Sequence, residues 1–210
     1  GMNQSLLEAL SHLQAGRFLR ARKSALAALS TEQSLREAKA GLPYGERLSA
    51  TAHLIAADAS HALQDAALRD KHWQQALDVL PIPGNTQDME IREGAQMRAA
   101  RWALDDRDAA ESIRRLGELP LGAGRRTIAL RIKLKAARLS GDTQAALDTA
   151  RLLAKHRAFS PAASASVVRG LLLASIRDAR DTSSLQQFWL SLDEDERAMP
   201  EVAIPATERL

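Results

Sequence analysis

The feature that most constrains the fold is a set of three residues that recurs five times at offsets i, i+4 and i+7. The copies are Ala21/Ala25/Ala28, Arg69/Trp73/Ala76, Ala109/Ile113/Leu116, Ala146/Ala150/Leu153 and Leu185/Trp189/Leu192. This spacing places the three residues on one face of an α-helix. Each copy follows a polar or glycine-containing turn, and another stretch of helical pattern precedes each turn. The sequence therefore predicts a helix–turn–helix unit that is repeated along the chain.

The turns give the approximate bounds of these units. In the segment 140–143, a glycine suits the end of one helix, and an Asp or Thr suits the start of the next. The predicted hairpins are 4–30, 46–80, 89–119, 125–155 and 161–192, and a further helix begins within 201–210. We expect a single domain, 1–210, of the all-α class: an α-solenoid of tetratricopeptide-like hairpins. It would contain about five antiparallel helix pairs in a right-handed superhelix.

The composition agrees with a helical chain and excludes several classes of site. Alanine and leucine dominate and aromatic residues make up 3%, which favours helix. The chain has no cysteine, so disulfides and cysteine-ligated metals are excluded. The most apolar run, 167–176, is interrupted by Arg169 and is too short to span a membrane, so it predicts a buried helix. Gly1 before Met2 resembles the remnant of a cleaved tag, and we expect the natural protein to extend beyond both ends.

The chain resembles two protein families. The segment 139–153 resembles the turn and second helix of a tetratricopeptide repeat, with Gly141 at the turn and Ala146 at the position of close helix approach. The first members of successive triplets lie 48, 40, 37 and 39 residues apart, however, whereas that repeat has about 34 residues. The first helices also lack the repeat's Trp-Leu-Gly-Tyr signature.

The chain is more similar to the proteobacterial HemY family. The segments that carry this resemblance are 48–80, 6–29 and 196–210, and their order fits along nearly the whole chain. The resemblance implies an inner-membrane tetratricopeptide protein that has two N-terminal membrane helices and is associated with a late step of haem biosynthesis. It implies no catalytic residues. By this resemblance the chain would be the soluble portion of a protein of the bacterial inner membrane, and it would face the cytoplasm.

Residues that could support catalysis or hold a metal are sparse. No two of the five histidines lie three or four residues apart, so no helix presents a ready metal pair. The sequence also lacks a glycine-rich phosphate loop and a serine nucleophile elbow. We therefore expect no catalytic residue, no metal site and no resident cofactor. His72, beside Trp73, and His53 are the candidates for ligands of a bound haem, and the plainer interpretation is a surface or interface histidine.

The most biased segment, 125–138, carries six basic residues and no acidic one. Within it, three cations at i, i+4 and i+7 share one helical face, and two more lie one turn apart in the preceding unit. These five residues are Arg98, Arg101, Arg131, Lys135 and Arg138. We expect them to line one groove that binds carboxylates: an acidic peptide, the C-terminus of a partner, or porphyrin propionates. The alternative is a solvated face whose counter-charges lie on the next helix.

A second basic cluster lies near the N-terminus. It consists of Arg17, Arg20, Arg22 and Lys23. Such a cluster suits anionic lipid head groups if the domain is held close to a bilayer. Solvation of the four side chains is the alternative interpretation.

These observations give three hypotheses about function. The first is a non-catalytic protein-interaction scaffold, tethered to the inner membrane, that organises enzymes or intermediates of haem biosynthesis. The second is a carrier whose basic groove binds the propionates of haem or porphyrin. The third is a peptide-binding repeat module unrelated to haem. We expect proteins, haem-pathway enzymes among them, or an acidic carboxylate ligand as partners. Nucleic acid is not expected, because no aromatic side chains are interleaved with the cations.

Overall fold

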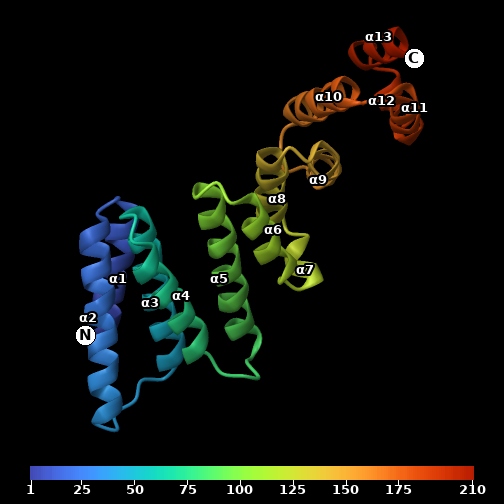
Figure 1. The fold of residues 1–210 in the computed structure, drawn as a ribbon. Helices are drawn as coiled ribbons and strands as arrows, with labels where there is room; N and C mark the ends of the chain where they lie inside the picture. Colours follow the sequence, from blue (N-terminus) through green and yellow to red (C-terminus); the bar gives the residue numbers. More distant parts are fainter. The chain divides into compact units, whose positions relative to one another are not determined.

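The computed structural model describes residues 1–210 and consists of thirteen helices without a strand (Figure 1). This confirms the predicted all-α class. The chain divides into two compact units, Gly1–Trp102 and Ala103–Leu210. The division falls within α5 (Thr86–Asp105), whose last residues belong to the second unit.

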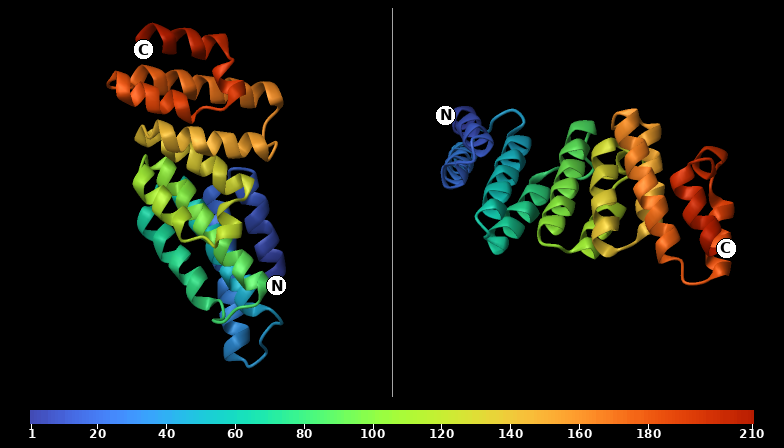
Figure 2. Two further views of the ribbon diagram at one scale, coloured as in Figure 1. Left: turned by 90° about the vertical axis from the view of Figure 1, so that its right-hand side faces the viewer. Right: turned by 90° about the horizontal axis from the view of Figure 1, so that it is seen from above.

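The first unit contains α1 to α4 and most of α5. The helices are α1 (Met2–Gln14), α2 (Phe18–Glu37), α3 (Gly45–Ala62) and α4 (Ala66–Val79). Each packs on its neighbour in the sequence, and the α1–α2 pair is seen most clearly in Figure 2. The second helix runs to Glu37, beyond the predicted end near residue 30. Its last turns are held by Arg36, which donates to Glu32 at 3.1 and 2.7 Å.

The core of the first unit is built largely from small side chains. Ala9 of α1 and Ala25 of α2 pack with Ile55 and Ala56 of α3. Small residues let helix axes approach closely, so many atoms of neighbouring helices come into contact. A second cluster surrounds Trp73, whose indole N–H donates to the Ala95 carbonyl at 2.8 Å. This bond satisfies the polar atom of a buried aromatic ring.

The second unit contains the remaining helices. They are α6 (Ala109–Gly117), α7 (Leu121–Gly124), α8 (Thr127–Ser140), α9 (Thr143–Lys155), α10 (Pro161–Asp178), α11 (Thr182–Ser191), α12 (Glu194–Arg197) and α13 (Pro200–Arg209). Figure 2 shows α10, α11 and α13 side by side. The core here contains larger side chains, with Leu147, Leu153, Leu172 and Ile176 almost completely buried.

Most residues of the repeated triplets lie in these cores. All three alanines of the first triplet are 0% exposed, and the triplet of α9 is buried as well. Ile113 is the exception, because its side chain is 41% exposed. In α6 the buried stripe runs through Ala109, Ser112 and Leu116, so the core face of this nine-residue helix is rotated past Ile113.

Aspartate side chains cap the N-terminus of the second helix in most of the helix pairs. The four N-caps are Asp65 of α4, Asp108 of α6, Asp142 of α9 and Asp181 of α11, each accepting a backbone N–H from three residues further on. Such a cap satisfies an N–H group that the helix itself leaves unpaired. The exception is α2, which begins after Arg17 and has no side-chain cap. The turn before α9 follows the prediction, with Gly141 in the left-handed region at φ 73°.

A nearly buried ion pair fastens α12 to α9. The guanidinium of Arg151 donates to both carboxylate oxygens of Glu196, with Nη2–Oε1 at 2.8 Å and Nε–Oε2 at 3.1 Å. The side chain of Glu196 is 8% exposed and that of Arg151 is 30% exposed. Glu196 also accepts the backbone N–H of Asp193, which closes a capping box at the start of α12. One carboxylate therefore connects α9 with the N-terminus of α12.

We predict that Glu196→Ala lowers the opening free energy of α9 and α12 by about 2 kcal/mol, because it leaves a partly buried guanidinium without its carboxylate. Hydrogen exchange followed by mass spectrometry measures this within the second unit alone. The matched control is Glu194→Ala, on the exposed side of the same short helix. Equal protection of α9 in both variants would contradict the role assigned to the ion pair.

Candidate functional site

The basic residues predicted on the fourth hairpin lie on an exposed face of α8. Arg131, Lys135 and Arg138 are all exposed, whereas Leu130 and Leu134 on the other side of the helix are buried. The guanidinium of Arg131 donates to the Ala158 carbonyl at 2.8 Å and lies over the Phe159 ring, 5.2 Å from its centroid. These contacts hold it against the loop between α9 and α10.

No carboxylate forms an ion pair with any of these three cations. Lys135 and Arg138 make no hydrogen bond to another side chain, and the bonds of Arg131 go to a carbonyl and a ring. The acidic residues of the neighbouring helix therefore form no ion pair with this face. The face remains positively charged and open to solvent.

Two exposed apolar side chains flank the cations of α8. Ile128 is 57% exposed and Leu139 is 36% exposed. With about 100° of rotation per residue, both project within a quarter turn of Lys135. We call the surface formed by Ile128, Arg131, Lys135, Arg138 and Leu139 the α8 face. It offers cationic and apolar contacts side by side, the combination that an acidic peptide with apolar residues can use.

Arg98 and Arg101 belong to the first unit and have a different environment. The Nε of Arg98 donates to Asp58 of α3 at 2.9 Å, so its charge is already compensated, while Arg101 is exposed. Arg98 lines a shallow groove of about 420 Å³ between α3 and α5 together with Arg47, which is bonded to Asp88 at 2.8 Å. The prediction that Arg98 and Arg101 share one groove with the α8 cations remains a prediction.

The two histidines named as ligand candidates face each other across the α3–α4 pair. The Nδ1 atoms of His53 and His72 are 3.0 Å apart and the ring centroids 5.3 Å apart. When both rings are neutral, one Nδ1 donates and the other accepts, so the rings are in opposite tautomers. This bond occupies the Nδ1 of each ring and leaves Nε2 as the nitrogen that a ligand would use.

A concave surface of about 480 Å³ lies beside this pair. Its lining includes His53, Glu32, Arg36, Ser49 and Gln75. The hydroxyl of Ser49 is buried and has no hydrogen-bond partner. Glu32 is paired with Arg36, and Glu37 adds a second carboxylate to the lining, so the surface does not attract an anion.

Sequence reasoning named both histidines but did not pair them. They are separated by 18 residues, a spacing that no motif uses. A signal does exist in the register of the hairpin: His53 lies ten residues before Leu63 and His72 seven residues after Asp65, so both are at similar distances from the turn. In an antiparallel pair, residues at similar distances from the turn lie opposite each other.

Burial changes the protonation of this pair. Desolvation, followed by the charge of His72, lowers the pKa of His53 from 6.5 to about 4. Desolvation also lowers the pKa of His72, with smaller contributions from Lys71 and Arg22. Both rings are therefore neutral at pH 7.

The structure contains neither a metal-binding cluster nor a helix that could span a membrane. No cluster of three or more His, Cys, Asp or Glu side chains has the geometry to hold a metal ion. None of the helices combines the length and the apolar character that crossing a bilayer requires.

Comparison with known proteins gives no match: no family model, no curated protein and no solved structure resembles the chain closely enough to be paired with it.

We predict that the first unit loses stability as the pH falls from 6.5 towards 4. The folded pKa of His53 lies below its unfolded value, so below pH 6.5 the unfolded chain binds a proton that the folded chain excludes. The loss is about 1.5 kcal/mol, roughly half that of a fully buried ring, because part of the ring faces solvent.

Urea unfolding at pH 7 and pH 4.5, followed by hydrogen exchange in α3 and α4, measures this loss. In His53→Gln the free energy of unfolding should depend less on pH than in the wild type. The control is His156→Gln, which removes an exposed imidazole after the end of α9. An unchanged pH slope in His53→Gln would refute the assignment.

Proposed function

We propose that the chain is a non-catalytic protein-interaction scaffold, an α-solenoid of tetratricopeptide-like hairpins whose α8 face binds a carboxylate-rich segment of a partner. The observation that supports this is that no carboxylate forms an ion pair with the cations of that face. Other arginines of the structure form ion pairs: Arg98 pairs with Asp58, and Arg151 pairs with Glu196. Lys135 and Arg138 do not, so they can pair with an external carboxylate without first breaking an internal bond.

The apolar rim of the α8 face favours a protein segment over a small anion. A free carboxylate would use the cations alone, whereas Ile128 and Leu139 can bury apolar side chains of a peptide. Arg131 is held in place by Ala158 and Phe159, so its guanidinium loses little freedom when a partner binds.

The resemblance to the HemY family supplies the proposed setting. On that basis the partners are enzymes of haem biosynthesis, and the scaffold is tethered to the inner membrane. The full-length protein, purified with a tag from its native membrane, should enrich such enzymes over an unrelated tagged membrane protein. Enrichment of none of them would overturn this part of the proposal and leave the binding face as a separate question.

We predict that the α8 face binds a labelled peptide in which glutamates are interspersed with leucines, and that binding weakens between about 50 and 200 mM salt. The double variant Lys135→Glu/Arg138→Glu should lower the affinity about tenfold or more, because two attractions become repulsions. Fluorescence polarisation measures both effects.

The matched control for this experiment is Arg20→Glu/Lys23→Glu. These residues are also exposed, have the same i, i+3 spacing on a helix and give the same change in net charge. The control should bind the peptide within twofold of the wild-type affinity. Equal losses in the two double variants would mean that the peptide responds only to net charge, and the proposal for the α8 face would fail.

A saturable Soret shift on haem titration that is lost in Lys135→Glu/Arg138→Glu would instead assign the face to propionates.

A further inference from the structure

The first helical hairpin carries an excess of positive charge. Residues 1–31 contain four basic residues and a single acidic one, Glu8. The whole chain has 29 basic and 26 acidic residues, so 25 of each remain in residues 32–210. Residues 1–31 therefore carry a formal charge of +3, and in the rest of the chain the basic segment 125–138 is offset by acidic residues elsewhere.

The same hairpin exposes large apolar side chains. Leu7 and Leu10 of α1 are 68% and 42% exposed, and Leu19 and Leu26 of α2 are 65% and 45% exposed. Leu19, Lys23 and Leu26 stand at i, i+4 and i+7, so they form one stripe along α2. Leucine is a residue that folded proteins usually bury, and several exposed together indicate a surface that contacts something apolar.

The stripe lies on the side of the hairpin that is turned away from α3. Ala9 and Ala25 pack against α3, and they mark the inner faces of α1 and α2. Leu19 and Leu26 are opposite the buried stripe of Ala21, Ala25 and Ala28, and Leu7 is more than a quarter turn from Ala9. No helix of the first unit covers this outer side.

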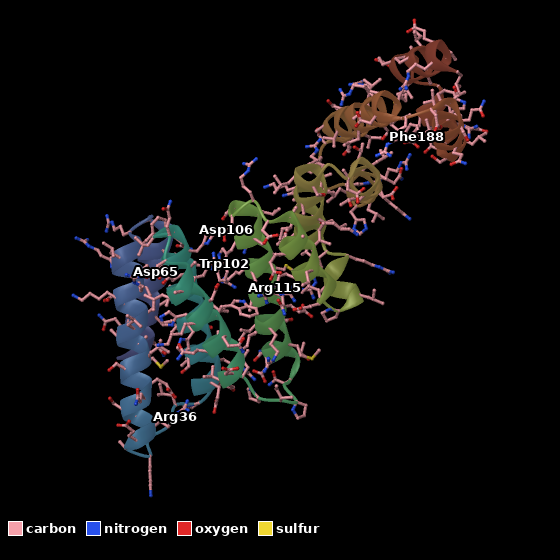
Figure 3. All side chains as sticks on the ribbon, viewed as in Figure 1. Arg36, Asp65, Trp102, Asp106, Arg115 and Phe188 are labelled. Atoms are coloured by element: carbon pink, nitrogen blue, oxygen red, sulfur yellow. The ribbon has the colours of Figure 1, made fainter.

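Three cations accompany the leucines and have no internal partner. Arg17, Arg20 and Lys23 are exposed and form no ion pair, whereas Arg22 reaches Asp65 at 3.5 Å. Asp65 begins α4 and is labelled in Figure 3, at the end of the first unit opposite that of Arg36. Arg17 and Arg20, together with Phe18 and Leu19, also line a shallow depression at the α1–α2 turn. Charge and apolar surface therefore meet at the start of α2.

We propose that this outer hairpin face, made of Leu7, Leu10, Arg17, Leu19, Arg20, Lys23 and Leu26, docks on the surface of an anionic lipid bilayer. In such a complex the leucines enter the boundary between head groups and acyl chains, while the cations contact phosphate oxygens. Neither the α8 face nor its partner is needed, so this inference goes beyond the function proposed above.

Charge complementarity identifies the bilayer as the occupant. A second copy of the chain related by two-fold symmetry would place Arg17, Arg20 and Lys23 of both copies in one interface, where like charges repel. An anionic bilayer offers the apolar environment that the leucines need and also neutralises the three cations. It is moreover an extended surface, and it can contact both helices of the hairpin at once.

Co-sedimentation with lipid vesicles tests the proposal. The full chain should bind vesicles of phosphatidylcholine containing about 30% phosphatidylserine and should not bind pure phosphatidylcholine, and added salt should weaken binding. Arg20→Glu/Lys23→Glu should lower the partition coefficient about 25-fold or more, because each cation contributes about fivefold. Leu19→Ser/Leu26→Ser should lower it about tenfold with the net charge unchanged.

The control is Lys135→Glu/Arg138→Glu, which makes the same charge change on α8 and should bind vesicles within twofold of wild type. Absence of wild-type binding to the anionic vesicles would overturn the proposal, and so would equal losses in the two charge-reversal variants. Light scattering after gel filtration tests the other possible occupant of this face, a second copy of the chain. If the wild type forms a dimer that Leu19→Ser/Leu26→Ser abolishes, and the vesicles bind neither, the face is an interface between copies. All exchanged side chains are exposed, so circular dichroism should find every variant folded.

Discussion

Every helix pair of the first unit depends on alanine stripes that a neighbouring helix must cover. Ala25 and Ala28 of α2 are completely buried, and so are Ala52 and Ala56 of α3. An alanine buries little apolar area, so stability in this unit comes from close approach along the whole length of the helices. The inner faces are therefore fully committed to packing. Binding residues can therefore lie only on the outer faces, where packing in the core does not determine which side chain is present.

The ion pairs of the structure distinguish the cations that connect helices from those that can bind a partner. Arg47 of α3 is bonded to Asp88 of α5, and this bond, followed by the backbone N–H of Asn85, helps to hold the pKa of Asp88 below its usual value. Arg151 is bound to Glu196 in a comparable way. Such arginines connect helices and are not free to bind a partner. The composition alone does not distinguish them from Lys135 or Lys23, because the distinction arises from which carboxylate the fold brings within reach.

The local part of the fold could be predicted from the sequence, and the contacts between helices could not. Gly141 and Asp142 mark a turn because left-handed backbone and N-capping are properties of single residues. The extension of α2 to Glu37 depends on the pairing of Glu32 with Arg36, and the position of Ile113 depends on how α6 is rotated. The approach of His53 to His72 likewise follows from the hairpin register and not from any sequence motif. In each case tertiary packing decided the outcome.

The two open basic faces have similar residues, so their partners differ through the arrangement of those residues. Each has cations at i, i+3 and exposed aliphatic side chains. The cations of the α8 face follow a single helix, whereas the outer hairpin face has exposed leucines on both α1 and α2. A bilayer carries charge over a wide area and responds to the summed field of a surface. A peptide presents a few carboxylates and responds to their local arrangement. The extended partner therefore fits the first hairpin, and the short acidic segment fits α8.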